Sequence, residues 1–159
     1  MADTISDGKT RVHWVATIAN PAAPTAAECT AGSDYTPRIT PDGLKIDPTT
    51  ADVDTSSLAS TFDTKEVGRV SYDTELTFKR GTTPSDDLPY TTLRYGVHGY
   101  LVVRRNLDYA TAFAAGQIVE VYYVACGEPA NISPAANEVA KFKSPMKVTT
   151  APGTLVTVA

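Results

Sequence analysis

The sequence predicts an all-β protein with one or two short helices, built as a β-sandwich or a barrel-like sheet. Residues 66–79 alternate apolar and polar side chains from Val70 onward, which is the period of a strand with one buried face and one wet face. Residues 99–105 and 117–125 are rich in β-branched and aromatic side chains, which favour strands. The length fits one domain, residues 1–159.

The N-terminal part begins with a polar stretch. Residues 1–10 are expected to form a flexible arm and residues 11–18 the first strand, which the prolines that follow bring to an end. Thr25 and Glu28 have the spacing of a capping box, and Gly32 supplies a C-terminal stop. This spacing predicts a helix of about one turn.

Turn residues dominate the next stretch, residues 33–65. We expect short strands there and a long loop, at about residues 47–62, that projects from the body. The long strand that follows places Tyr72, Leu76 and Phe78 on its apolar side, as core or interface anchors. A strand of this length needs partners along its edges, and other copies of the chain are one source of them.

The second half of the chain is again mostly strand. Residues 89–95 read as a second short helix, with a proline in its first turn. After the two strands named above, residues 139–148 are expected to form a strand interrupted at Pro145. Residues 154–158 are a last strand or part of a C-terminal tail that begins at about residue 147.

Several large side chains in the predicted strands have no chemical motif around them. Trp14, Tyr122 and Tyr123 are expected to be core or interface anchors. Arg104 and Arg105 are adjacent in a strand and therefore point to opposite faces, so they do not form a phosphate clamp. We expect one of the two to pair with a carboxylate across the sheet.

Composition and motifs argue against several classes of function. The formal charge of −4 and a pI of about 5.1 argue against a strongly basic surface that grips nucleic acid. His13 and His98 fit no HExxH or HxH spacing, Ser71 lacks a GxSxG turn, and no phosphate-binding loop is present in the sequence. Asp52 and Asp54 lack the further ligands of a calcium loop. We therefore expect no catalytic, cofactor or metal site, and a protein that is not an enzyme.

The two cysteines and the N-terminus bear on the compartment. Cys29 and Cys126 fit no CxxC motif, and two free thiols in a reducing compartment are favoured over a disulfide between them. The polar N-terminus resembles neither a signal peptide nor a transit peptide. No run approaches 18 apolar residues, so we expect no membrane span and a cytoplasmic start.

Taken in order, these stretches resemble the major tail tube proteins of long-tailed, siphovirus-type bacteriophages. The likeness spans nearly the whole chain and is one of pattern, without a catalytic signature. It rests on RVHWV at 11–15, NPAAPTAAE at 20–28, the turn at 30–34, ITPDGLKID at 39–47, VDTSSLASTFDT at 53–64, GRVSYDTELTFKR at 68–80, YTTLRYGVHGYLVVRR at 90–105 and AGQIVEVYYVACGEP at 115–129.

The resemblance implies a structural virion protein with no enzyme activity and no cofactor. Its subunit would be a β-sandwich whose sheets join those of neighbouring copies in a six-membered ring, and the rings would stack into a hollow tube. DNA would pass down the lumen without specific binding. Other partners would be the tape measure, tail tip and tail terminator proteins. The protein would assemble in the host cytoplasm and be located in the phage tail.

The resemblance also directs attention to particular segments of this chain. Asp73, Glu75 and Glu120 are candidates for an acidic lumen lining that keeps DNA away from the wall. The alternative is an ordinary solvent face with cross-strand ion pairs. Glu120 has the weaker case, because it shares a strand side with apolar residues. For ring stacking, the candidates are the N-terminal arm, the projecting loop and the C-terminal tail, with plain disorder in the single chain as the alternative.

Other readings of the whole chain stay open at this point. A different virion part, such as a tail terminator or a capsid decoration protein, would share much of the pattern. A monomeric β-sandwich that binds a peptide or a glycan would do so too.

Overall fold

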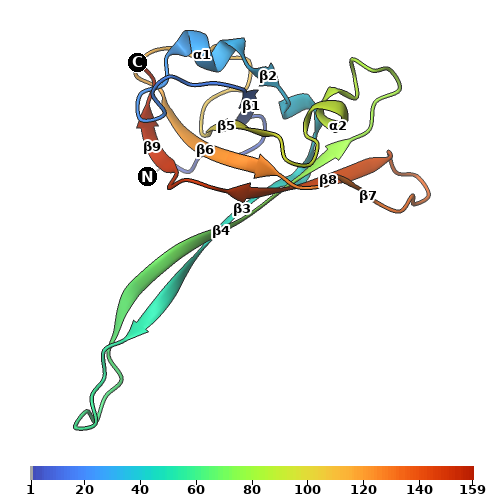
Figure 1. Cartoon of the computed structure of the whole chain (residues 1–159). Coiled ribbons are helices and arrows are strands. Elements are labelled where there is room, and N and C mark those ends of the chain that lie inside the picture. The colour runs from blue at the N-terminus through green and yellow to red at the C-terminus, as the bar shows by residue number, and fades with distance from the viewer. Residues whose placement is uncertain (1) are drawn as a thin grey trace.

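The computed structural model describes residues 2–159, and the chain is mostly strand with two short helices and one 3-10 turn in that range (Figure 1). The elements are β1 (Arg11–Val15), α1 (Ala26–Ala31), β2 (Ser33–Asp34), η1 (Thr36–Arg38), β3 (Ile39–Asp54), β4 (Lys65–Lys79), α2 (Leu88–Thr92), β5 (His98–Arg104), β6 (Ile118–Cys126), β7 (Ala130–Asn131), β8 (Lys141–Val148) and β9 (Gly153–Thr157). The predicted all-β class with one or two short helices is confirmed.

All nine strands of the described range belong to one antiparallel sheet, in the order β2-β1-β5-β6-β8-β4-β3. β7 pairs with β8, and β9 pairs with the first half of β6. The sheet curls without closing into a barrel, so that β1, β5 and β6 lie over β8, β4 and β3 (Figure 1). The two layers of the sandwich are thus parts of one continuous sheet.

The space between the two layers holds the larger hydrophobic core. Alternation along each strand supplies it, because every second side chain points inward. Trp14 from β1, Leu76 and Phe78 from β4 and Phe142 from β8 all lie in this cluster. The rings of Phe78 and Phe142 stack with centroids 5.2 Å apart. Position 99 requires glycine, because a Cβ there would overlap the indole of Trp14.

A second hydrophobic core lies on the other face of β1, β5 and β6. α1 and the C-terminal strand β9 cover that face, and Val102, Cys29 and Val156 meet there. The capping box of α1 forms as expected: the Thr25 hydroxyl accepts from the Glu28 amide at 3.2 Å, and Glu28 accepts from the Thr25 amide at 2.9 Å. Among residues 2–159, no helix lies over the solvent-side face of β3, β4 and β8.

The expectation of short strands and a loop over residues 47–62 is wrong for its first half. β3 runs without interruption from residue 39 to residue 54 and pairs with β4 along that length, apart from two register irregularities. Pairing outweighs the turn-rich composition here. Pro48 is tolerated because β3 is the edge strand of the sheet, and Pro41 lies in one of the irregular stretches.

The second helix is shorter than expected and the C-terminal segment is more ordered. α2 spans five residues, and Leu93 just after it is buried in the larger core. The interruption expected at Pro145 does not occur, because β8 is continuous through this residue. Before Pro145, β8 pairs with β7, and after it β8 pairs with β6. Residues from 147 onward are not a free tail, because β9 pairs with β6 and Val158 is buried.

Candidate functional site

The β3–β4 hairpin reaches well beyond the body of the molecule (Figure 1). β8 pairs with β4 only from Thr74 to Lys79. Further out, from Thr50 and Val70 to the tip, β3 and β4 pair only with each other in the described structure. Two-stranded hairpins are marginally stable in water on their own. The outer half of this hairpin therefore has the geometry of an element that another surface completes.

Apolar side chains continue along the outer hairpin with nothing to cover them. Tyr72 of β4 packs edge-to-face on Tyr122 at 5.8 Å, at the margin of the larger core. Val70 and Val67 follow it along the strand, and they are 54% and 80% exposed. The same side of β4 that fills the core thus extends past the core and meets solvent.

The tip of the hairpin is tied by its own hydrogen bonds. The Thr55 amide donates to the Thr64 carbonyl at 3.0 Å, and the two hydroxyls of this pair lie 2.9 Å apart. Between these two residues, Leu58 is fully exposed and Phe62 is largely exposed. The tip presents two apolar side chains on a backbone that is already ordered, which reduces the entropy cost of docking.

The free edge of the sheet is a second uncovered feature. β3 is the last strand in the order, and its outer edge pairs with no other strand between residues 2 and 159. An unpaired edge of 16 residues is a template for another strand. Charged side chains and Pro48 lie along it, but most of its backbone groups can still pair.

Two of the three candidate lining residues lie together on the uncovered face of β3, β4 and β8. Asp73 accepts from Lys45 Nζ at 2.6 Å, and this hydrogen bond lowers the pKa of Asp73. Glu75 pairs with Lys143 at 3.2 Å. Both carboxylates are therefore matched by a lysine on a neighbouring strand, so this face is less acidic than the carboxylates alone suggest. Their role in lining a lumen stays a prediction.

Glu120 lies elsewhere, on the core-facing side of β6. One of its oxygens accepts from Arg105 Nε at 2.8 Å and the other accepts from the Tyr122 hydroxyl at 2.9 Å. Burial and the adjacent carboxylate raise the pKa of Tyr122. Arg105 is thus the arginine that pairs across the sheet, as the sequence predicts. Arg104 is buried and donates to backbone carbonyls of the 105–117 connection.

The anchor residues divide between core and surface. Trp14, Leu76, Phe78 and Tyr122 are buried in the larger core, with Tyr72 packed at its margin. Tyr123 instead lies on the outer face of β6, half exposed.

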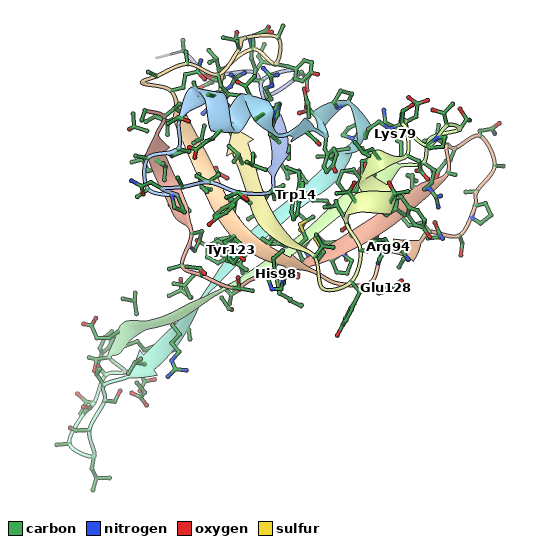
Figure 2. All side chains as sticks on the ribbon, turned by 45° about the horizontal axis from the view of Figure 1, so that its top comes forward. Trp14, Lys79, Arg94, His98, Tyr123 and Glu128 are labelled. Carbon is green, nitrogen blue, oxygen red and sulfur yellow. The ribbon has the colours of Figure 1, made fainter. Side chains whose placement is uncertain are left out.

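Tyr123 belongs to an aromatic row that sequence reasoning missed. It packs against Tyr100 at 4.8 Å and against His98 at 6.0 Å, across the β5–β6 pair. Figure 2 shows His98 and Tyr123 near the root of the hairpin. The register Tyr100↔Tyr123 is what brings the rings together, and no local sequence signal gives that register.

The structure assigns structural roles to the other residues weighed for chemistry. His13 is buried, where its Nδ1 donates to the Cys29 carbonyl at 2.9 Å and its Nε2 accepts from Arg11. Within residues 2–159, no three His, Cys, Asp or Glu side chains gather as a metal site would require. None of the helices in that range is both long and apolar enough to cross a membrane.

The two cysteines lie in different hydrophobic cores and do not pair. Cys29 is in the cluster under α1, and Cys126 is in the larger core between the layers. Burial raises the pKa of both thiols, that of Cys126 to about 11. They are therefore inert packing residues.

The described part of the N-terminal arm contains no helix or strand, but its end is attached to the body. The Tyr109 amide donates to the Gly8 carbonyl at 2.8 Å, and the Leu107 amide donates to the Lys9 carbonyl at 3.3 Å. Residues 2–7 are exposed. Met1 lies outside the described residues.

The curled antiparallel sheet thus presents a free edge and an uncovered hairpin, two features suited to pairing with further strands. The model of the phage tail tube protein family matches residues 1–159, so the chain belongs to that family. It is a structural component of a phage tail.

The chain also resembles a solved structure. That structure is a chain of the cryo-EM structure of the anti-feeding prophage (AFP) baseplate, 6-fold symmetrised, with 10% identity, 96% of each chain covered and a TM-score of 0.61. At this identity the likeness shows a shared fold. No curated protein matches the chain.

Proposed function

We propose that this protein assembles into six-membered rings, that the rings stack into the hollow tube of a phage tail, and that genomic DNA passes through the tube into the host. Membership of the tail tube family supports the tubular role. The proposal of six subunits per ring is supported by the fold that this chain shares with a chain from a six-fold symmetrised assembly.

The observation that carries this proposal is the outer half of the β3–β4 hairpin. It has no third strand, it continues the apolar side of β4 into solvent through Val70 and Val67, and its ordered tip exposes Leu58 and Phe62. These features are costly in an isolated chain and become favourable when a neighbouring copy covers them. The hairpin is therefore the main contact between copies.

Ring closure is proposed to use the free edge of β3. Pairing of this edge with a strand of the next copy would satisfy its backbone groups and remove the aggregation hazard of a long exposed edge. Repeated around a ring, such pairing joins the sheets of all copies into one barrel. The contact is heterologous, since an edge meets a different edge, and a heterologous contact is the kind that closes into rings.

The polar face of β3, β4 and β8 is proposed to line the channel. No helix or further strand of the described part of the chain lies over it, and the strands that form it also form the hairpin and the free edge. Asp73 and Glu75 would then belong to the wall. A place for Glu120 in the wall is the weakest part of this proposal, because contacts with Arg105 and Tyr122 already engage both of its carboxylate oxygens.

Contacts along the tube axis are proposed for three segments: the arm at 1–10, the hairpin end at about 47–62 and the C-terminal segment at about 147–159. Partners beyond the protein itself would be the tape measure, tail tip and tail terminator proteins. Assembly would take place in the host cytoplasm and the mature location would be the phage tail. None of these steps requires catalysis.

Negative-stain electron microscopy of the purified protein over a concentration series tests the proposal. Rings or hollow tubes with a central channel are expected, either alone or after addition of tail tip proteins as an initiator. Compact monomers at every concentration, with and without the initiator, would refute it. Such monomers would favour a β-sandwich binding module, and single closed rings that never stack would favour a tail terminator or another virion part.

A further inference from the structure

An open groove lies beside the aromatic row of β5 and β6. Its lining includes Tyr100 and Tyr123, together with Thr150 and Ala151 of the connection between β8 and β9. The groove has a volume of about 340 Å³, and no charged side chain of the described residues lines it. Tyrosine side chains on an open surface are typical anchors of contacts between proteins, because they offer a large apolar area and a polar end. The groove therefore has the character of a docking surface.

This groove is continuous with the surface that the hairpin leaves uncovered. A second groove, of about 500 Å³, lies between Val70 and Tyr72 of β4 and the same connection. Thr150 and Ala151 line both grooves. The apolar side of the hairpin, which is proposed to contact another copy, thus continues across the connection to the aromatic row. The occupant of the aromatic groove is therefore expected to be part of another copy as well.

The tip of the hairpin has the side chains that this groove would accept. Phe62 is 78% exposed and Leu58 is fully exposed, on a tip whose backbone is held by its own hydrogen bonds. A phenyl ring packs favourably on tyrosine rings in an offset or edge-to-face arrangement. A cavity of about 150 Å³ is enough for a benzene ring, so the groove has room for the side chain of Phe62.

The charges of the two surfaces are also compatible. Asp63 is the only charged side chain in residues 55–64. The strand registers place His98 and Lys147, both bases, two positions along from Tyr123 on the neighbouring strands. Asp73 on β4 is already paired with a lysine of β3. A tip that inserts its phenyl ring in the groove would therefore bring a carboxylate toward basic side chains.

The tip cannot reach the groove of its own chain. Figure 1 shows that the hairpin extends away from the body. Tyr72 packs against the body, and Lys65 at the tip end of β4 lies seven residues further out, about 23 Å along an extended strand. The tip that fills the groove must come from a second copy. Such a contact is heterologous, so it can repeat from copy to copy along a stack.

We infer that the hairpin tip of one copy docks into the aromatic groove of another copy, with Phe62 packed against Tyr100, Tyr123 and Ala151. This inference rests on the proposed function for the direction of the contact along the tube. It deepens that function, because two of the three segments proposed for axial contacts, the hairpin end and the C-terminal segment, then bind each other.

Cross-linking between two single-cysteine variants tests the contact directly. Thr61→Cys places a thiol beside Phe62, and Ala151→Cys places one in the groove; both positions are exposed. The two native cysteines are buried and do not compete. The matched control replaces Ala151→Cys by Ala136→Cys, since Ala136 is an exposed alanine in the loop between β7 and β8.

The two variants are mixed in equal amounts under mild oxidation, over a concentration series. Thr61→Cys with Ala151→Cys should form a disulfide-linked dimer at least about tenfold faster than the control pair, because docking raises the effective concentration of the two thiols. Non-reducing gel electrophoresis measures the rate, and mass spectrometry of the linked peptides identifies the 61–151 disulfide. Equal rates for the two pairs over the whole series would overturn the inference.

Two further substitutions, alone and together, test whether the tip and the groove bind each other. Phe62→Ser and Tyr123→Thr should each raise the concentration needed for assembly by at least about tenfold, as loss of an aromatic anchor does. The double variant should be little worse than either single variant, because both changes remove the same contact. Sedimentation measures assembly, and thermal unfolding checks that each variant folds. Effects that multiply would overturn the inference, since the tip and the groove would then have different partners.

Electron microscopy of the cross-linked material separates this inference from the proposed function. Tubes that lack the 61–151 disulfide would overturn the inference and leave the proposed function standing, with the groove open to a different tail protein. A 61–151 disulfide in linear chains that contain no rings would support the inference and refute the proposed rings.

Discussion

Replacing the two uncovered valines of the hairpin by threonine, Val67→Thr/Val70→Thr, should block assembly without unfolding the chain. Threonine keeps the β-branched shape and the preference for strands. In the single chain both positions are largely exposed, at 80% and 54%, so the free energy of unfolding should change by less than about 0.5 kcal/mol.

The effect on assembly should be much larger. Loss of two methyl-sized apolar groups from a buried contact removes about 1 kcal/mol per copy. Each hydroxyl that is buried without a partner costs about 1 kcal/mol more. A total of about 3 kcal/mol raises the protein concentration needed for assembly by about 100-fold.

Sedimentation of assembled material over a concentration series measures this shift, with thermal unfolding of the unassembled protein as the check on folding. Val139→Thr is the matched control, since Val139 is a 59% exposed valine between β7 and β8, outside the hairpin and outside the segments proposed for ring contacts. The reasoning would be refuted by a double variant that assembles at the wild-type concentration, or by a control that is impaired equally.

Three further predictions concern stability and chemistry. Gly99→Ala should destabilise the fold by about 1–3 kcal/mol in chemical denaturation, because its Cβ would overlap the Trp14 ring; an unchanged midpoint would contradict the core packing. The hydrogen bonds from Arg80 lower the pKa of Asp87, so this carboxylate stabilises the fold above the ordinary carboxyl pKa near 4 and loses that contribution as pH falls. Asp87→Asn should therefore lower the free energy of unfolding at pH 7 and reduce its loss between pH 5 and pH 3; an unaltered pH profile would refute this. Cys126, whose pKa burial raises to about 11, should react with a thiol reagent only after unfolding, and rapid labelling of the native protein would contradict the burial.

Local pattern was sufficient for most of the strands and for α1. The long strand predicted at residues 66–79 matches β4 to within one residue, although regular alternation covers only its second part, from Val70 onward, most of which has one face in the core. The capping box of α1 is likewise a local signal, and its side chains and backbone groups meet as the spacing predicts.

β3 shows where local pattern fails. Its sequence is rich in Asp, Thr and Pro, and on its own it favours turns. It is extended because β4 pairs with it over most of its length, and the local sequence of β3 contains no signal of this pairing. The same applies to the aromatic row of Tyr100 and Tyr123, which depends on the register of β5 with β6.

The candidate wall was predicted only in part. Asp73 and Glu75 do share the uncovered face, as alternation implies. Their lysine partners come from β3 and β8, so the charge of the face could be known only from the strand order. The alternation in KFKSPMK at 141–147 already placed three lysines on one side of a strand, and it is the signal that would have pointed to the lysine partners on β8.

A reconstruction of the assembled protein by cryo-electron microscopy tests the central claim most directly. The account predicts a hollow tube of stacked six-fold rings in which the β3–β4 hairpin of each copy lies against a neighbouring copy and the polar face of β3, β4 and β8 faces the channel. An assembly in which the hairpins project freely into solvent, or in which this face lies on the outside, would contradict it.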